Sequence, residues 1–595
     1  MALYDDASLI FLGSAAAGKE TDDASKAYSV KPTNGNGDFT ISRTDNLNQT
    51  RVGPTGLIEK GRENLLLQSN GLNNSPWTPS GDSTVTTGQS GYDGSSNAFL
   101  ISKVSEQFGG VNQDVTASNV HTFSAHLKAG SVNFARLFTG PANVFFDLSG
   151  SGSIGATSGT KVDATLTSIG NGWFRCTVTV SGSTSVVKIN PAIGDNDLGT
   201  TGDGDNGTGT GSIFVQDCQL EAGLVATEVI TTGAATATAG IKEDEPRFDY
   251  PIAGGPPSLL IEPQAINIVT HSEGITLAIK QGTGVVASAP TEASPAGYIG
   301  GVVQASNLQG AEGDRARVGL SSITNGDTVS GYFYIKGDSG KAINVTLKRN
   351  GAGDHRGTTI THTCDGEWQK VGPMENVTMD GGNDEAAMFL VNSSSSGSTL
   401  DSCLLWGYQI EKTSFSTSYI PCHGAAATRS RDDVTALDTS GFSFGTTCTI
   451  FYEGIINQAT ASHVRPVTMF GSHGSPADAE RYLLFATSFS GTTYTLSSKH
   501  NTTPSSTLVS KSVIKAGLTI GAKVKCASVF NGTSFKFFVN GALADSGGTT
   551  TITAASIFNS LDLSQVAADQ NHTVGSIILW GSALTNQQCI DLTTL

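Results

Sequence analysis

The sequence predicts an all-β protein made of antiparallel β-sandwiches in series, with an extended N-terminal arm. Three observations support this fold class. Of 595 residues, 72 are glycine and only 15% are charged, which suits short strands and tight turns better than helical bundles. Asn-Gly turns separate runs of β-branched and aromatic residues. One stretch of the chain repeats, and a chain of this length exceeds what a single core supports.

The repeat joins Ile213–Ile230 to Cys403–Pro421. Four pairs match at one constant offset: Gln219 with Gln409, Glu221 with Glu411, Thr227 with Thr417, and Ile230 with Ile420. Upstream, Thr122–Gly130 resembles Val329–Gly337. Agreement over this length predicts one structural unit, of domain size, that occurs twice.

Residues 1–62 do not match the repeat and carry too little apolar material for a core of their own. Ala7–Leu12 and Arg51–Glu59 read as short extended pieces, and glycine, proline and asparagine interrupt the rest. We expect an arm that becomes ordered by packing on a partner or on sister chains. The alternative is an extra set of strands on the first module.

We place the first module at residues 63–233, a linker at 234–257 and the second module at 258–427. In the first module, Gly170-Asn171-Gly172 predicts a hairpin that continues into the strand Trp173–Val180. In the second, Asp365-Gly366 before Trp368 repeats this order of turn and tryptophan. Alternating strands with frequent turns imply jelly-roll-like sandwiches. The linker is rich in small residues and prolines, which predicts an extended tether.

Residues 428–595 predict a third sandwich of a different kind. Lys523–Phe530 and Ser534–Val539 pair through Asn531-Gly532, and Asn540-Gly541 turns the chain again. The chain ends with a strand through Trp580 and a short helix that begins near Thr585.

Composition and motifs exclude several classes of function. A net charge of −17 without a basic cluster argues against a nucleic-acid groove. No apolar run approaches the ~20 residues that span a bilayer, and the N-terminus lacks the positive charge of a signal peptide. No nucleophile elbow, HExxH, P-loop or dinucleotide fingerprint occurs. We expect no enzymatic activity, although a glycosidase carboxylate pair is defined by distance in space and leaves no sequence signature.

The eight cysteines are scattered, without a CxxC pair or a zinc-like spacing. Most lie in apolar, strand-like runs, so we expect buried free thiols. The alternative is a disulfide such as Cys176–Cys218 or Cys403–Cys422. Assembly in a reducing cytosol would favour free thiols.

We expect no cofactor and no metal. The loop Gly194–Gly211 carries Asp195, Asp197, Asp203 and Asp205, whose oxygens would suit calcium. The spacing fits no EF-hand, and a solvated loop is the alternative.

Sugar recognition needs an exposed aromatic face with polar groups around it. Trp173 and Trp368 start strands directly after turns, and Trp406 and Trp580 lie in apolar runs, so we expect all four in the core. Trp77 lies between Pro76 and Thr78 in a loop-like segment. It is the predicted carbohydrate-binding residue.

Several phrases resemble recurrent phrases of tailed-bacteriophage virion proteins that carry tandem carbohydrate-binding-module-like jelly rolls. They are Arg51–Glu59, Pro246–Asn267, Leu166–Val180 and Trp406–Pro421. The last unit, with Phe530–Ala544 and Ile577–Gln588, resembles a concanavalin A or laminin-G-like domain of phage fibres. The resemblance covers nearly the whole chain.

The first module departs from this pattern at two steps. Gln216-Asp217 replaces Trp406-Gly407, and Glu228-Val229 replaces Ser418-Tyr419. These departures put any ligand site shared with the second module in doubt there. By analogy with the fold, loops Ser472–Arg481 and Asp569–His572 of the last unit would be ligand edges, although fold does not fix function.

The resemblance implies a non-enzymatic structural protein, a fibre or decoration protein of capsid or tail, on the virion surface after assembly in the host cytoplasm. Its arm would bind other virion proteins, and its copies would self-associate, most simply as a trimer. Its modules would meet host or environmental glycans, and many copies would strengthen weak single sites. The alternatives are a tail receptor-binding adhesin that recognises host glycans and a glycan-degrading tailspike.

Overall fold

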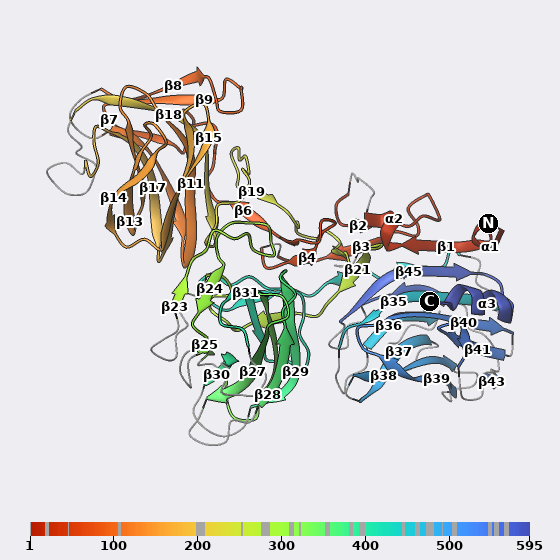
Figure 1. The fold of residues 1–595 in the computed structure, drawn as a ribbon. Coiled ribbons are helices and arrows are strands. Elements are labelled where there is room, and N and C mark those ends of the chain that lie inside the picture. Colours follow the sequence, from red (N-terminus) through yellow and green to blue (C-terminus); the bar gives the residue numbers. More distant parts are fainter. Residues whose placement is uncertain are drawn as a thin grey trace.

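The chain folds into three β-sandwiches joined by a central junction (Figure 1). A computed structural model describes residues 2–17, 23–45, 47–104, 109–197, 209–251, 254–274, 286–308, 315–320, 323–350, 357–379, 385–391, 399–442, 447–458, 464–471, 481–490, 492–502, 509–532, 534–544, 550–551, 558–564 and 571–595. Nearly all regular structure there is antiparallel β-sheet, as the sequence predicts.

The first module packs two six-stranded sheets on one core. One sheet runs in the order β15 (Asp163–Gly170), β16 (Trp173–Ser181), β11 (Val120–Ala129), β18 (Gly211–Ala222), β9 (Ala98–Lys103) and β8 (Ser83–Gln89). The other runs β14 (Ser153–Gly159), β13 (Ala142–Asp147), β12 (Phe134–Thr139), β17 (Thr184–Ala192), β10 (Gly109–Ala117) and β7 (Thr78–Gly81). The predicted hairpin is β15–β16, and Asn171 in its turn has φ 54°.

The second module repeats the strand order of the first. Its larger sheet runs β29 (Gln369–Thr378), β26 (Thr328–Gly337), β31 (Cys403–Glu411), β24 (Val303–Ser306) and β23 (Val286–Ser288). These strands correspond in order to β16, β11, β18, β9 and β8. The facing sheet runs β25 (Arg315–Leu320), β30 (Glu385–Val391), β27 (Ala342–Asn350) and β28 (Gly357–Thr363). The predicted repeat is therefore one of structure as well as of sequence.

The C-terminal sandwich draws strands from the whole chain. Its first sheet runs β20 (Phe248–Asp249), β21 (Ser258–Ile261), β45 (His572–Trp580), β35 (Thr447–Ile456), β40 (Lys523–Asn531), β41 (Ser534–Val539) and β42 (Ala542–Leu543), with β1 (Ala7–Leu12) on β45 and β43 (Thr550–Thr551) on β41. The second runs β34 (Leu437–Asp438), β44 (Phe558–Asp562), β36 (Val464–Gly471), β37 (Arg481–Ser490), β38 (Thr493–Thr502) and β39 (Val509–Thr519). The predicted double Asn-Gly meander is β40–β41–β42.

The N-terminal segment, residues 2–62, packs on its own chain. Strand β1 pairs with β45, and Leu9 and Phe11 are fully buried in the core of the C-terminal sandwich. Our expectation that this arm needs a partner or sister chains for its order is therefore wrong. The alternative of extra strands on the first module does not hold for β1 either, because its sheet partner lies more than 550 residues away in the sequence. Figure 1 shows both termini at the C-terminal sandwich.

Short elements complete the segment and the junction. They are α1 (Ala2–Asp5), α2 (Gly13–Ala17), β2 (Lys26–Ala27) and β3 (Phe39–Ser42) with β33 (Asp433–Val434), β4 (Thr50–Val52) with β5 (Ile58–Lys60), β6 (Arg62–Asn64) with β19 (Ala237–Ala239), and β22 (Ala265–Asn267) with β32 (Ala427–Arg429). The last two pairs close the first and second module in the same way. The helix predicted near Thr585 is α3 (Asn586–Thr593), with Thr585 as its N-cap.

The linker is not a free tether, because strands β20 and β21 add it to the sheet of the C-terminal sandwich. Ser258–Ile261, which we had assigned to the start of the second module, therefore belongs to that sheet. Backbone pairing with β45 holds this stretch in place, and the composition of the linker does not reveal that pairing.

Five buried charges, which we call the arginine hub, fix the junction. Their side chains are no more than 3% exposed: Arg43, Arg247, Glu262, Arg429 and Asp432. Arg43 pairs with Asp432 at 2.8 Å, and Arg247 pairs with both Glu262 and Asp432. Burial raises the pKa of Asp432, but Arg247 and Arg43 outweigh it and hold that pKa at about 2. The hub joins the N-terminal segment, the linker and the end of the second module.

All eight cysteines are buried free thiols, as expected, so neither suggested disulfide is present. Within the described part of the chain, no helix is long and apolar enough to span a membrane.

Candidate functional site

Trp77, the predicted carbohydrate-binding residue, is buried. Its side chain is 4% exposed, packs in the core of the first module, and donates from Nε1 to the carbonyl of Gln68 at 3.0 Å. The prediction failed because the loop-like segment folds back over the core and turns the indole inward. Trp173, Trp406 and Trp580 lie in the core, as expected. The expectation is wrong for Trp368, which is only half-buried and donates to the carbonyl of Ala293 at 2.9 Å.

The other predicted ligand positions fall largely outside the described residues. Asp203 and Asp205 of the acidic loop lie there, as do residues 472–480 and 569–570 of the C-terminal loops. Asp195 and Asp197 are described, and they accept backbone hydrogen bonds from Ala156 and Ile193. The described ranges hold no group of three side chains that could bind a metal ion. His572, at the end of the predicted ligand edge Asp569–His572, is fully buried.

The repeated polar residues form a buried cluster in each module, which we call the polar knot. In the second module Gln409 donates to Glu411 at 2.5 Å, and Thr417 donates to Glu411 from its backbone and its hydroxyl. Asn267 ties the knot to the module's first strand, since its amide donates to the carbonyls of Tyr408 and Ile420. Burial raises the pKa of Glu411 to about 7, although the hydrogen bonds from Thr417 and Gln409 lower it.

The first module has the same knot with nearly the same distances. Gln219 donates to Glu221 at 2.6 Å, and Thr227 donates to Glu221 through the same two groups. Asn64 takes the place of Asn267 and donates to the carbonyls of Cys218 and Ile230. The residues that revealed the repeat therefore serve the fold.

A pocket of about 550 Å³, the junction pocket, is the best candidate for a functional site. It lies against the second module, on the sheet face opposite the core, where Tyr332 and Tyr334 of β26 point outward on either side of the core residue Phe333. Four parts of the chain line it: the N-terminal segment, the linker, the second module and the C-terminal sandwich.

The junction pocket combines aromatic rings with ionisable groups. The Lys370 ammonium lies 3.6 Å from the centroid of the Tyr332 ring, a cation–π contact. Asp249 accepts a hydrogen bond from the Val52 amide at 2.7 Å, and burial raises the pKa of Asp249 to about 6. Burial also raises the pKa of Glu375, which accepts from the amide of Ser416 at 3.2 Å.

Tyr419 closes one side of the junction pocket with its ring. Its hydroxyl bonds to Ser272 and Glu273, and its ring packs 4.7 Å from that of Trp406. Burial raises the pKa of both Tyr334 and Tyr332, so their hydroxyls stay protonated near neutral pH. Rings, hydroxyls and carboxyls around one cavity fit a polar ligand with an apolar face.

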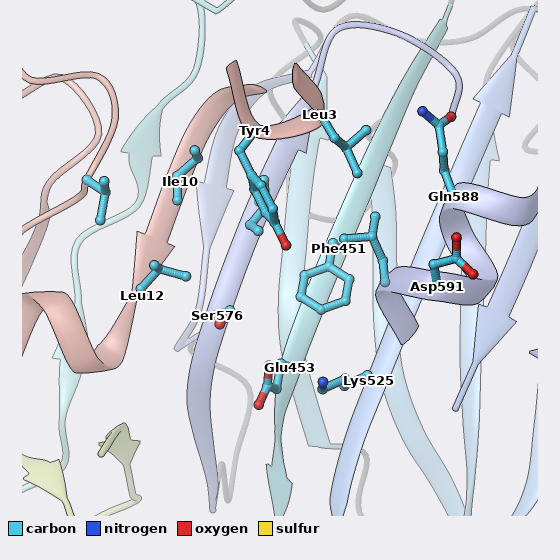
Figure 2. A pocket seen from close by; sticks show the side chains of 13 residues that line it. Leu3, Tyr4, Ile10, Leu12, Phe451, Glu453, Lys525, Ser576, Gln588 and Asp591 are labelled. Atoms are coloured by element: carbon cyan, nitrogen blue, oxygen red, sulfur yellow. The ribbon is translucent and has the colours of Figure 1, made fainter. Parts of the chain in front are cut away.

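A second hollow, the end groove, has a volume of about 660 Å³ and lies where the two chain ends meet on the C-terminal sandwich. Figure 2 shows Tyr4 of α1 and Phe451 over its apolar floor, with Gln588 and Asp591 of α3 on the far side. Tyr4 is 46% exposed. The charges have partners, since Glu453 pairs with Lys523 at 2.9 Å. The end groove is thus mainly an apolar surface.

Sequence reasoning missed the junction pocket. The alternation of Tyr332, Phe333 and Tyr334 on one strand indicates two outward-facing rings, and this could have been predicted from the sequence. The other lining residues of the pocket could not be predicted, because residues as far apart as Val52, Asp249 and Asn571 come together only in the folded chain.

No protein-family model and no curated protein matches the chain. Among solved structures, a CBM40 of the Ruminococcus gnavus IT-sialidase, bound to α2,6-sialyllactose, is 13% identical, covers 27% of this chain and 92% of that chain, with a TM-score of 0.22. The CBM22 tandem of Paenibacillus barcinonensis Xyn10C is 14% identical and covers 62% and 98%, at 0.21. A Trypanosoma rangeli sialidase in complex with DANA is 10% identical and covers 92% and 97%, at 0.20. Scores this low carry no argument about ligand or activity.

Proposed function

We propose that the protein is a non-enzymatic structural protein of a tailed-phage particle, a fibre or decoration protein of capsid or tail, that binds carbohydrate. The observation that carries the binding is the junction pocket, where tyrosine rings and hydrogen-bonding carboxyls surround one cavity. Sugars combine an apolar ring face with hydroxyls, and such a pocket meets both. The assignment to a phage particle rests on the four phrases that resemble virion proteins.

In this proposal, the exposed part of the N-terminal segment contacts the particle. Its inner side chains are buried in the C-terminal sandwich, so contact with other virion proteins falls to exposed residues such as Tyr4 and Val30. A trimer would present three sites together, and linked sites bind a multivalent glycan more tightly than one site does. No cofactor is part of this proposal. A tail adhesin for host glycans would use the same site at another place on the particle.

Two measurements on the full chain test the proposal. A glycan array should give saturable binding, and cryo-electron microscopy of particles labelled with a specific antibody fragment should place the protein at the capsid or tail surface. A chain that binds no glycan contradicts the carbohydrate part. A chain that never co-sediments with particles contradicts the virion part.

A glycan-degrading enzyme is the second candidate, and one observation favours it. Asp249 and Glu375 line the same pocket, and burial raises the pKa of both carboxyls, as a general acid requires. Release of reducing ends from a glycan that the chain binds, abolished in both Asp249→Asn and Glu375→Gln, would support hydrolysis. Binding without release supports the non-enzymatic function.

A further inference from the structure

Two buried polar atoms, on residues that line the junction pocket, have no hydrogen-bond partner among the described residues. They are the hydroxyl of Ser416 and the side-chain carbonyl of Asn571, on residues 8% and 2% exposed. The Asn571 amide nitrogen donates to the backbone carbonyl of Ser416 at 3.2 Å, so the Asn571 side chain lies against the backbone of Ser416. Buried polar groups in native proteins are nearly always hydrogen-bonded. A polar ligand that forms hydrogen bonds with these two atoms would therefore gain binding free energy.

The two atoms belong to different parts of the chain. Ser416 follows β31 of the second module, and Asn571 precedes β45 of the C-terminal sandwich. The amide hydrogen bond between them joins these two parts directly. A ligand that satisfies both atoms therefore contacts both parts at once.

Two carboxyls supply further hydrogen-bond acceptors in the wall of the pocket. Asp249 and Glu375 each accept one backbone hydrogen bond that is described, and a carboxylate offers two oxygens with about four acceptor positions. Ligand hydroxyls donate to such oxygens. The lining holds two cations, Lys370 and Arg51, and a third carboxyl, Glu262. Arg51 pairs with Glu59 at 2.7 Å and Glu262 pairs with Arg429 at 2.8 Å. The charge balance therefore favours neither a cationic nor an anionic ligand.

The rings supply the complementary apolar surface. Tyr332 and Tyr334 meet edge to face, with centroids 6.0 Å apart, and Tyr334 packs 5.7 Å from Trp406. These neighbours hold the Tyr334 ring in place. The protein therefore loses little conformational entropy when a sugar ring stacks on Tyr334. A volume of about 550 Å³ lies in the range of small-ligand sites.

We propose that the junction pocket binds an uncharged mono- or disaccharide unit, and that this ligand bridges the second module and the C-terminal sandwich. This inference rests on the proposed carbohydrate-binding function and adds the site, the ligand class and a mechanical consequence. The site is complete only when all four parts of the chain are assembled. Ligand binding therefore stabilises the arrangement of the domains as well as the pocket.

Isothermal titration of the full chain with neutral sugars tests the proposal, with glucose, galactose, mannose, N-acetylglucosamine and their disaccharides as probes. At least one should bind saturably. Tyr334→Ala should weaken it about tenfold, whereas Tyr334→Phe should keep the ring and most of the affinity. Tyr4→Ala removes an exposed ring from the end groove, outside the junction pocket, and should leave sugar affinity unchanged.

The variant Ser416→Ala tests whether a loss of sugar affinity comes from the missing contact and not from unfolding. It removes an unpaired buried hydroxyl, so the free chain should be no less stable, while sugar affinity falls. The bound sugar should also slow protease cleavage between the second module and the C-terminal sandwich in the wild type, and not in Ser416→Ala.

The outcomes separate this inference from the proposed function. Glycan binding that Tyr334→Ala and Ser416→Ala both leave intact would overturn the junction pocket and leave the proposed function standing. A full chain that binds none of these sugars and no array glycan would overturn both. Binding of charged sugars alone would overturn the ligand class.

Discussion

The two modules share a buried knot and differ on the face that covers it. Asn64 and Asn267, Gln219 and Gln409, and Glu221 and Glu411 repeat the same hydrogen bonds. On the outward face of the same sheet, His126 of the first module stands where Tyr334 stands in the second. Each lies at the same register between its two neighbouring strands, beside a β-bulge.

The bulge requires a left-handed backbone conformation in both modules, and a different residue type provides it in each. Asp217 with φ 50° and Gly407 with φ 68° occupy the same position, so both modules need a left-handed residue there. The first module places a carboxylate at this point, which accepts a hydrogen bond from Tyr92 at 2.7 Å. The second leaves it free of a side chain. Backbone geometry is thus retained while the chemistry of the face changes.

The two steps at which the sequences depart mark contacts with other parts of the chain. Glu228 of the first module pairs with Arg62 and accepts from Tyr298 of the second module. At the matching position Ser418 donates to Glu262 of the arginine hub at 2.6 Å. The positions at which the two modules differ therefore contact other parts of the chain. The positions at which they are identical stabilise each module internally.

The largest expected effect is at the hub. Arg247→Met would leave Glu262 and Asp432 short of a buried partner, and removing one member of a buried ion pair costs ~3–5 kcal/mol. Denaturant unfolding, followed by fluorescence, measures the loss. The matched control is Arg431→Met, because Arg431 and its partner Asp433 are 40% and 44% exposed and such pairs contribute ~0–1 kcal/mol. Equal losses would contradict the account.

The next effect tests the shared knot. Asn64→Ala and Asn267→Ala each leave several buried backbone groups unpaired, at about 1–3 kcal/mol for a group. Native-state hydrogen exchange should show each variant opening its own module, by similar amounts. A much smaller loss at one of the two positions would break the equivalence of the knots.

A smaller effect is the pH dependence of Asp249. Its pKa is raised to about 6, so the folded chain binds this proton more tightly than the unfolded chain. The free energy of unfolding should then fall as pH rises from about 4 to about 6. Asp249→Asn should remove this fall, by ~1–2 kcal/mol, in melting curves across that window. Asp114→Asn, at an exposed carboxylate, is the control. A wild-type profile that rises in this window would contradict the assignment.

The smallest effect lies between the modules. Glu228→Ser removes the pair with Arg62, but the Glu228 side chain is 71% exposed, so the loss should stay within ~0–1 kcal/mol. Ser418→Glu, the reverse exchange, would add a carboxylate beside Glu262 and should cost more. Thermal melting of both variants gives the comparison, and a larger loss for Glu228→Ser would overturn it.

Local signals predicted the fold well. The Asn-Gly turns at 171–172, 531–532 and 540–541 each reverse the chain between paired strands, and the capping Thr585 starts α3. Such features depend on neighbours in sequence, which the sequence displays directly. The constant offset of four residue pairs, three of them polar and one isoleucine, also located the two modules.

Long-range packing was not predicted. Leu9 and Phe11 looked like part of an arm without a core, because their core comes from the other end of the chain. Trp77 looked exposed because the fold of its loop was unknown. The junction pocket needs four segments at once, and of its parts only the alternation of Tyr332 and Tyr334 left a sequence signature.

The central claim is that the enclosed face of the second module, and not the matching face of the first, binds carbohydrate. The most direct test is a glycan array probed with the full chain and two matched variants, Tyr334→Ala and His126→Ala. The account predicts that Tyr334→Ala weakens glycan binding about tenfold, whereas His126→Ala keeps it. A signal that Tyr334→Ala leaves unchanged and His126→Ala abolishes would contradict it.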